Sequence, residues 1–97
     1  MNLFVHPEAL AELNNAAAFY TERANKELGI ALISEFERAL SLLSSDPALG
    51  AIWRGSTRRL PLRRFPYNLV YQIKPQEIRI IALAHQRRRS GYWTGRK

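Results

Sequence analysis

The chain has 97 residues, with 15 Lys and Arg against 8 Asp and Glu, so its formal net charge is +7 at pH 7. This length accommodates a single domain, and a hydrophobic content of 46% with 10% aromatic residues is too high for a disordered chain. With no cysteine, two histidines and one aspartate, the sequence excludes disulfides and a thiolate nucleophile, and it predicts no metal site and no cofactor.

The first predicted elements are a short strand and a helix. Asn2 to Val5 is an apolar run typical of an edge strand. A helix begins at His6-Pro7-Glu8, because proline in the first turn loses no hydrogen bond and Glu8 faces the positive end of the helix dipole. The spacing of its apolar residues predicts a buried stripe of Leu10, Leu13, Ala17 and Tyr20.

A second helix follows a short polar turn, Thr21 to Asn25, in which Asn25 is the expected N-cap. Gly29 near its start costs about 1 kcal/mol relative to alanine in a helix. The helix ends before Pro47, since the residue preceding a proline is forced out of the helical region. The short connection predicts an antiparallel helix hairpin, whose second buried stripe is Ile30, Ile33, Phe36, Leu40 and Leu43.

The apolar period changes after Gly50. Leu60, Leu62 and Phe65 alternate with arginines and predict a half-buried strand. Leu69 to Ile73 predicts a central strand, and Ile78 to Ala84 predicts a returning strand that is buried on both faces. We therefore predict one α+β domain over residues 1–97: a short N-terminal strand and an antiparallel helix hairpin packed on a C-terminal antiparallel β-sheet.

Two further patterns bear on location. No stretch approaches the roughly 18 consecutive apolar residues of a membrane span. The N-terminus has no basic region followed by an apolar one, so it does not resemble a signal peptide. We expect a soluble cytoplasmic protein with no membrane partner.

The charge is divided unevenly between the two halves of the chain. Residues 1–48 hold three bases and seven acids, a net −4, whereas residues 49–97 hold twelve bases and one acid, a net +11. This segregation indicates an anionic partner, either nucleic acid or an acidic protein segment, although a solvated basic surface is the simpler alternative. The candidate binding residues are Arg58, Arg63, Arg64, Arg87, Arg89 and Trp93.

A second candidate site lies just after the last strand, where His85, Arg88 and Tyr92 are spaced i, i+3, i+7. In a helical tail these residues would share one face, and together they offer a base, a cation and an acid for phosphodiester transfer. The simpler interpretation makes His85 the polar end of a strand and Tyr92 a packing residue, and spacing alone favours it.

The aromatic residues of the second half are candidate base-stacking platforms. Tyr71 lies in the middle of a predicted strand and is therefore expected in the core. Carboxylate catalysis has little support, because Asp46 and Glu77 are isolated in turns and the other acids lie on helix faces. The aromatic set is Trp53, Tyr67, Tyr71, Tyr92 and Trp93.

Five segments occur in a characteristic order: His6-Pro7-Glu8-Ala9, Asp46-Pro47-Ala48-Leu49-Gly50, Arg58-Arg59-Leu60-Pro61-Leu62, Phe65-Pro66-Tyr67-Asn68-Leu69-Val70-Tyr71, and the terminal His85, Arg88, Tyr92 and Trp93. Together they resemble the ParE/RelE superfamily of type II bacterial toxin–antitoxin toxins over nearly the whole chain. The resemblance implies a short strand, a helix hairpin and a three-stranded antiparallel segment, in agreement with the independent prediction above.

The resemblance implies one of two activities. ParE-like members inhibit DNA gyrase, arrest growth and stabilise plasmids, and they are not known as nucleases. RelE-like members cleave mRNA on the ribosome. A site of the RelE type would use as catalytic residues Arg59, His85, Arg88 and Tyr92.

Two positions favour the ParE-like branch. Asn68 and Gln86 stand where a RelE-like site would carry cations, and a site that stabilises phosphate charge is weakened by their loss. The Phe65-Pro66-Tyr67 segment also resembles the ParE-like branch more closely.

The superfamily further implies a cognate antitoxin. A net charge of +11 over the second half predicts that this partner supplies an acidic, partly disordered segment that folds on the toxin. A groove between the helix hairpin and the sheet edge is the expected docking surface. The predicted cellular target is DNA gyrase or, alternatively, the ribosome with its mRNA; a basic binding module without toxicity is the remaining alternative.

Overall fold

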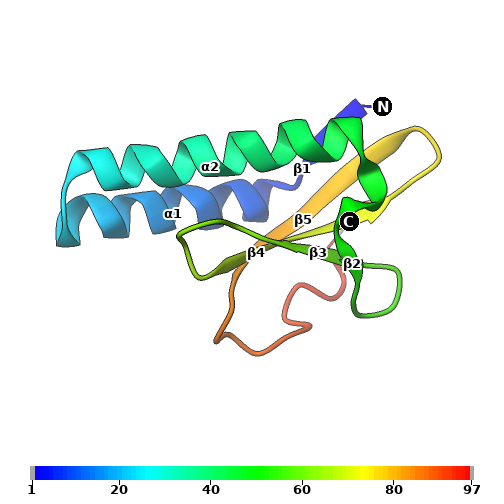
Figure 1. The fold of residues 1–97 in the computed structure, drawn as a ribbon. Coiled ribbons are helices and arrows are strands. Elements are labelled where there is room, and N and C mark those ends of the chain that lie inside the picture. The colour runs from blue at the N-terminus through cyan, green and yellow to red at the C-terminus, as the bar shows by residue number, and fades with distance from the viewer. Residues whose placement is uncertain (1, 97) are drawn as a thin grey trace.

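The structure, a computed structural model, describes residues 2–96. It confirms the predicted α+β class (Figure 1). The elements are β1 (Asn2–Val5), α1 (Pro7–Arg23), α2 (Lys26–Ser45), the 3-10 turn η1 (Pro47–Leu49), β2 (Ala51–Ile52), β3 (Arg58–Pro61), β4 (Tyr67–Ile73) and β5 (Glu77–His85). No helix within this range is both long and apolar enough to cross a membrane.

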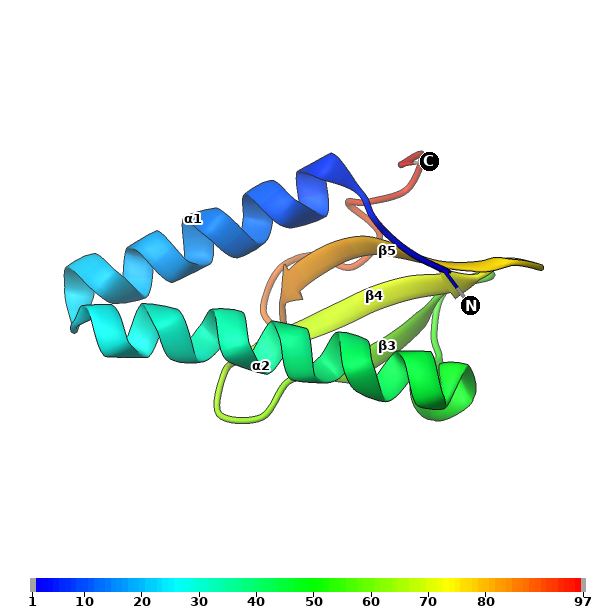
Figure 2. The ribbon, with the colours of Figure 1, turned by 90° about the horizontal axis from the view of Figure 1, so that it is seen from above.

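The five strands form one mixed sheet in the order β1-β5-β4-β3-β2. The hairpin-linked strands β2 to β5 pair antiparallel, as expected. β1 lies at a sheet edge, also as expected, but it pairs parallel with β5 (Figure 2). A parallel pair requires a long connection, and here the chain between β1 and β5 comprises the helix hairpin and the strands β2 to β4.

Both predicted helix starts are present, and Asn25 is the predicted cap of the second. The His6 side chain accepts a hydrogen bond from the backbone N–H of Glu8, and Pro7 occupies the first helical turn of α1. Asn25 caps α2 by accepting from the N–H of Leu28 at 2.8 Å. The two predicted helices are therefore confirmed, although α1 continues to Arg23, two residues past Thr21, where we expected the turn to begin.

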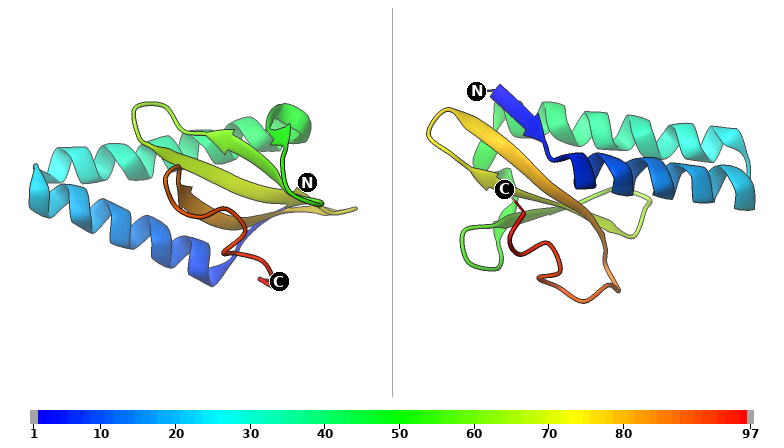
Figure 3. Two further views of the ribbon diagram at one scale, coloured as in Figure 1. Left: turned by 90° about the horizontal axis from the view of Figure 1, so that it is seen from below. Right: turned by 180° about the vertical axis from the view of Figure 1, so that it is seen from behind.

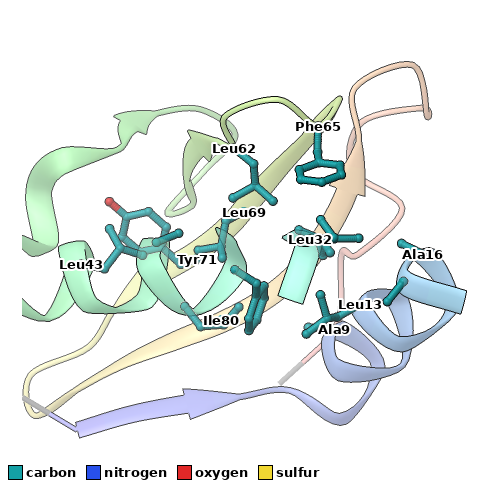
Figure 4. Packing of buried hydrophobic residues seen from close by; sticks show 14 of the residues in the cluster. Ala9, Leu13, Ala16, Leu32, Leu43, Leu62, Phe65, Leu69, Tyr71 and Ile80 are labelled. Atoms are coloured by element: carbon teal, nitrogen blue, oxygen red, sulfur yellow. The ribbon is translucent and has the colours of Figure 1, made fainter. Parts of the chain in front are cut away.

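The helices cover one face of the sheet and enclose the main core (Figure 4). The predicted stripes are each partly wrong, since Leu10 is 47% and Ile30 57% exposed. The buried face is rotated toward smaller side chains, which let the helices approach the sheet and each other. In α1 it consists of Ala9, Leu13, Ala16 and Ala17, and in α2 of Gly29, Leu32, Phe36, Ala39 and Leu43.

Gly29 explains how the two helices come so close. A Cβ atom at this position would lie 2.2 Å from Thr21 Oγ1 and 2.7 Å from the carbonyl oxygen of Ala17. The glycine is thus required by the helix crossing, and its low helix propensity is accepted in exchange for close packing.

The segment after β3 is a tight turn, which corrects the predicted strand through Leu62 and Phe65. β3 ends at Pro61, and Arg64 has a positive φ of 69° that no strand residue adopts. Leu62 and Phe65 nevertheless belong to the main core, so the pattern correctly predicted that they are buried but not that they form a strand. We call residues 62–66 the β3–β4 turn.

The tail, residues 86–96, crosses the sheet face opposite the helices (Figure 3). It is built of turns and contains no helix. Trp93 is 4% exposed and packs in a second apolar cluster with Val70, Ala82 and Ala84. Both faces of β5 are consequently buried, as its sequence predicted.

We expect Gly29→Ala to lower the free energy of unfolding by about 1–3 kcal/mol, the usual cost of overpacking, because the backbone carbonyl of Ala17 cannot rotate away. Helix propensity alone would change stability in the opposite direction by about 1 kcal/mol. Urea denaturation measures the difference. Ser41→Ala, at an exposed position of the same helix, is the control and should be neutral or slightly stabilising. A Gly29→Ala protein more stable than the wild type would contradict the close crossing.

Candidate functional site

The carboxylate of Glu12, on α1, joins three parts of the chain. It accepts a hydrogen bond from the Tyr92 hydroxyl at 2.6 Å and from the backbone N–H of Leu83 in β5 at 3.0 Å. The Arg96 guanidinium donates to both of its oxygens, at 3.0 and 3.2 Å. The Glu12 side chain is only 15% exposed, so these are shielded, charge-assisted contacts.

Arg96 is held by a second acid of the same helix. Its Nε lies 3.2 Å from Glu8 Oε2, and its Nη1 also donates to the carbonyl oxygen of Ile81 at 3.1 Å. Glu8 and Glu12 are four residues apart and therefore share one helix face. The two acids fasten the end of the tail to the start of α1.

Tyr92 is committed to this arrangement as a hydrogen-bond donor. Burial raises the pKa of its hydroxyl far above the ordinary value of 10.0, and the bond to Glu12 raises it further. The Arg88 guanidinium stacks on its ring at 3.6 Å from the centroid and lies 3.8 Å from Glu12. The tyrosine is held protonated and its proton already has an acceptor, which makes it a poor proton donor to a substrate.

His85, at the end of β5, borders a groove of about 300 Å³ between α1 and the sheet. Its ring meets that of Tyr67 edge to face, with centroids 5.1 Å apart, and its Nδ1 accepts from the backbone N–H of Arg87 at 3.1 Å. Phe19, 49% exposed, forms part of the opposite wall. The groove is thus mainly apolar, with His85 and Arg88 at its polar end.

Arg59 lies apart from the other three predicted catalytic residues. It pairs with Val70, whose side chain belongs to the cluster on the tail side of the sheet, and its guanidinium stacks on Trp53 at 4.6 Å. His85 pairs with Tyr67, which packs against the main core on the helix side. The structure therefore brings Arg88 and Tyr92 together and places Arg88 and His85 in the lining of one groove. Tyr92 itself packs against the cluster on the tail side, and Arg59 lies on the sheet face opposite His85.

Two of the predicted binding residues have structural partners. Arg58 donates to the carbonyl oxygens of Ala48 and Gly50, at 3.3 and 2.8 Å, and so ties β3 to the segment after α2. Trp93 is buried between the tail and the sheet, where its ring is 5.1 Å from that of Trp53. Trp93 is therefore not available as a contact surface, whereas Arg58 is only partly buried and already has backbone partners.

The other four predicted binding residues are exposed and gather at one end of the sheet. Arg63 and Arg64 belong to the β3–β4 turn, and Arg87 and Arg89 to the start of the tail. The backbone N–H of Gln86 donates to the Pro66 carbonyl at 2.8 Å, which joins the two segments. Figure 2 shows both at the same end of the molecule. We call these four residues the arginine rim.

Sequence reasoning missed two acids, Glu12 and Glu35. Glu35 of α2 accepts the backbone N–H of Arg63 at 2.6 Å and two bonds from Arg38, both at 2.7 Å. Both acids lie on helix faces, as predicted, but their partners in the tail and in the β3–β4 turn were not predicted. For Glu12, the i, i+4 spacing from Glu8 in a chain with a basic tail was the available signal; for Glu35, no sequence pattern indicates its partner in the turn.

No metal site accompanies these groups. Within residues 2–96, no cluster of three or more His, Cys, Asp and Glu side chains is arranged to hold a metal ion.

The fold can now be compared with those of known proteins. The family described as "ParE toxin of type II toxin-antitoxin system, parDE" matches residues 3–90. A solved structure described as "Chromosomal ParDE TA system from P. aeruginosa" superposes with a TM-score of 0.78 and 22% identity, covering 88% of this chain and 95% of that one. No curated protein matches significantly.

These similarities define the class of the protein as a toxin of type II toxin–antitoxin systems, because the family match spans nearly all of the chain. Within that class, the chain belongs to the ParE toxin family. The predicted resemblance is thereby confirmed, and the structural similarity independently supports the fold.

We expect Glu12→Gln to lower the free energy of unfolding by about 1–3 kcal/mol, since hydrogen bonds to charged groups contribute about 1.5–3 kcal/mol each and the amide retains one acceptor. The tail should also loosen, which faster amide exchange of residues 92–96 would reveal. Glu22→Gln, which removes the same charge from an exposed position of α1, is the control. Equal effects of the two substitutions would contradict the role of Glu12 in holding the tail.

The pH dependence of stability tests the Glu35 contact. The hydrogen bond from Arg38 is the largest influence, and it holds the pKa of Glu35 below the ordinary value of 4.5. The ionised carboxylate therefore stabilises the fold above about pH 4.5, and this contribution is lost as the pH falls through the lowered pKa.

We accordingly expect Glu35→Gln to be clearly destabilising at pH 7 and progressively less so as the pH falls below 4.5. Thermal unfolding of wild type and variant across this range measures the gap. Glu37→Gln, on the exposed side of α2, should show no comparable gap. A difference between wild type and Glu35→Gln that does not change with pH would contradict the assignment.

Proposed function

We propose that this ParE-family toxin acts in the cytoplasm, where it inhibits DNA gyrase and arrests growth, and that a cognate antitoxin neutralises it. The proposal rests on the family and on the neutral residues Asn68 and Gln86, which stand where a ribosome-dependent nuclease would carry cations. Asn68 is, moreover, 7% exposed on the strand face that the tail covers, pairing with Ala84.

The hydrogen bond between Tyr92 and Glu12 is the observation that carries the choice of gyrase over mRNA. A nuclease needs a group that can transfer a proton to the leaving oxygen. The obvious candidate is Tyr92, whose hydroxyl already donates a hydrogen bond to the carboxylate of Glu12 at 2.6 Å. Arg59 lies on the opposite face of the sheet from His85. Inhibition of another protein, by contrast, requires a binding surface and no proton-transfer group.

The groove beside α1 supports the antitoxin part of the proposal. Its exposed Phe19 and its walls of Ala16, Tyr67 and Leu83 suit the apolar side of an amphipathic segment, and Arg88 at the end suits a carboxylate. An acidic, partly disordered antitoxin segment fits both requirements. Its affinity should therefore weaken as salt is raised.

The alternative is a ribosome-dependent mRNA endonuclease that uses Arg59, His85, Arg88 and Tyr92. One observation favours it: Arg88 and Tyr92 are stacked at 3.6 Å beside the groove that His85 lines. The tail would have to release Tyr92 from Glu12 before such a site could act.

Supercoiling of relaxed plasmid by purified gyrase tests the proposal. We expect added toxin to reduce supercoiling and to leave a trapped cleavage complex, and equimolar antitoxin to restore activity. Tyr92→Phe keeps the ring under Arg88 but removes the hydroxyl, so it should inhibit gyrase like the wild type if it remains folded. Unaltered supercoiling together with cleavage of mRNA on programmed ribosomes would overturn the proposal in favour of the alternative.

A further inference from the structure

The arginine rim is one exposed part of the basic surface. Elsewhere within residues 2–96, salt bridges join Arg38 to Glu35, Arg79 to Glu77, Arg96 to Glu8 and Glu12, and Arg88 to Glu12 at a longer distance. Within residues 2–96, none of the rim side chains, Arg63, Arg64, Arg87 and Arg89, forms a salt bridge. Four positive charges are therefore left together at one end of the sheet.

The backbone beneath the rim is fixed. Glu35 accepts the N–H of Arg63 at 2.6 Å, Pro66 accepts that of Gln86 at 2.8 Å, and His85 Nδ1 accepts that of Arg87 at 3.1 Å. These bonds hold both rim segments against the end of the sheet. The charges are presented from a rigid support, which limits the entropy lost when a ligand binds.

The conformation of Arg64 is an independent sign of function. It is the one residue other than glycine with a positive φ within residues 2–96, at 69°. Non-glycine residues in this region cost about 1 kcal/mol or more, and such strain tends to persist at binding and active sites. Here the strain occurs at the tip of the β3–β4 turn and under a charged side chain, where a glycine or asparagine would relieve it.

The composition of the rim narrows the class of ligand. Phe65, the large apolar residue of the β3–β4 turn, is 5% exposed, and the apolar surface at the rim is confined to a small pocket of about 240 Å³ against α2, lined by Ala31, Arg63 and Phe65 among others. The nearby Tyr67 ring is engaged with His85, and Trp93 is buried, so neither ring offers a free face for stacking on single-stranded bases. What remains is a group of guanidinium donors, which match the closely spaced phosphates of duplex DNA.

We propose that the arginine rim binds the phosphate backbone of duplex DNA, and that this contact anchors the toxin to the DNA held by its target. The inference rests on the proposed inhibition of gyrase, because that enzyme works on duplex DNA. The rim reads no sequence, since phosphate contacts position a protein without specifying bases.

Binding of a labelled DNA duplex by the antitoxin-free toxin, followed by fluorescence anisotropy at several salt concentrations, tests the proposal. Arg64→Gln and Arg89→Gln, one from each rim segment, should each weaken binding and lower the slope of log affinity against log salt by about one. The double variant should lower it by about two. Lys74→Gln, an exposed charge in the turn between β4 and β5 at the other end of the sheet, is the charge-matched control and should leave the slope unchanged.

Three results would overturn the proposal. The first is absence of DNA binding by the wild type, and the second is an equal effect of Lys74→Gln, which would show attraction by net charge only. The third is a loss of antitoxin affinity in the rim variants while DNA binding is retained, which would make the rim a protein-docking surface. Circular dichroism of each variant verifies that it is folded.

A supercoiling assay separates this inference from the proposed function. If both the inference and the proposed function hold, a higher concentration of a rim variant than of Lys74→Gln should be required for the same inhibition of gyrase. Full inhibition by rim variants that no longer bind DNA would overturn the inference and leave gyrase as the target. Rim-dependent DNA binding without any effect on gyrase would instead overturn the proposed function and the anchoring role with it.

Discussion

The carboxylate of Glu12 is the contact on which the arrangement of this protein depends. It is reached by donors from β5 and from the tail, and it compensates the charge of Arg96 in a largely buried position. Without it the Tyr92 hydroxyl and Arg96 would lose their main partner, and Trp93 would no longer be held over Val70 and Ala82. One acid thus links the layer of helices, the sheet and the segment that covers its far face, and leaving buried partners unpaired is the costly kind of loss.

The uneven charge of the chain has two separate physical roles in the folded protein. Arg96 and Arg58 act within the structure, one against acids of α1 and the other against backbone carbonyls after α2. The arginine rim forms no salt bridge within residues 2–96, although Arg64 stacks on Phe65 and the charge of Arg63 helps to lower the pKa of Glu35. The mutual repulsion of its charges lowers stability. A net charge of +11 over residues 49–97 is therefore partly a means of joining the two halves of the fold and partly a surface facing outward.

Much of the fold could be predicted because the decisive signals are local. Pro7 and Asn25 mark helix starts by backbone chemistry that does not depend on context. The exposed Leu10 and Ile30 show the limit: hydrophobic spacing gives the period of a helix, whereas its rotation is decided by which residues allow close approach. At the candidate site, Arg88 and Tyr92 were predictable as neighbours, but the acid that holds Tyr92 comes from the other end of the chain, and no local pattern encodes that distance.

The separation along the sequence between Glu12 and its partners has a consequence for how the toxin comes into being. Tyr92 and Arg96 lie 80 and 84 residues after Glu12. Likewise, β1 can pair with β5 only after β5 has been synthesised. Contacts this remote form late and slow the folding of small domains. During synthesis, the helix hairpin can emerge and pack long before the strands that complete the protein. The fold of the toxin can therefore be completed only after residues 92–96 have been synthesised, and a partner already present in the cell can meet the chain before that point.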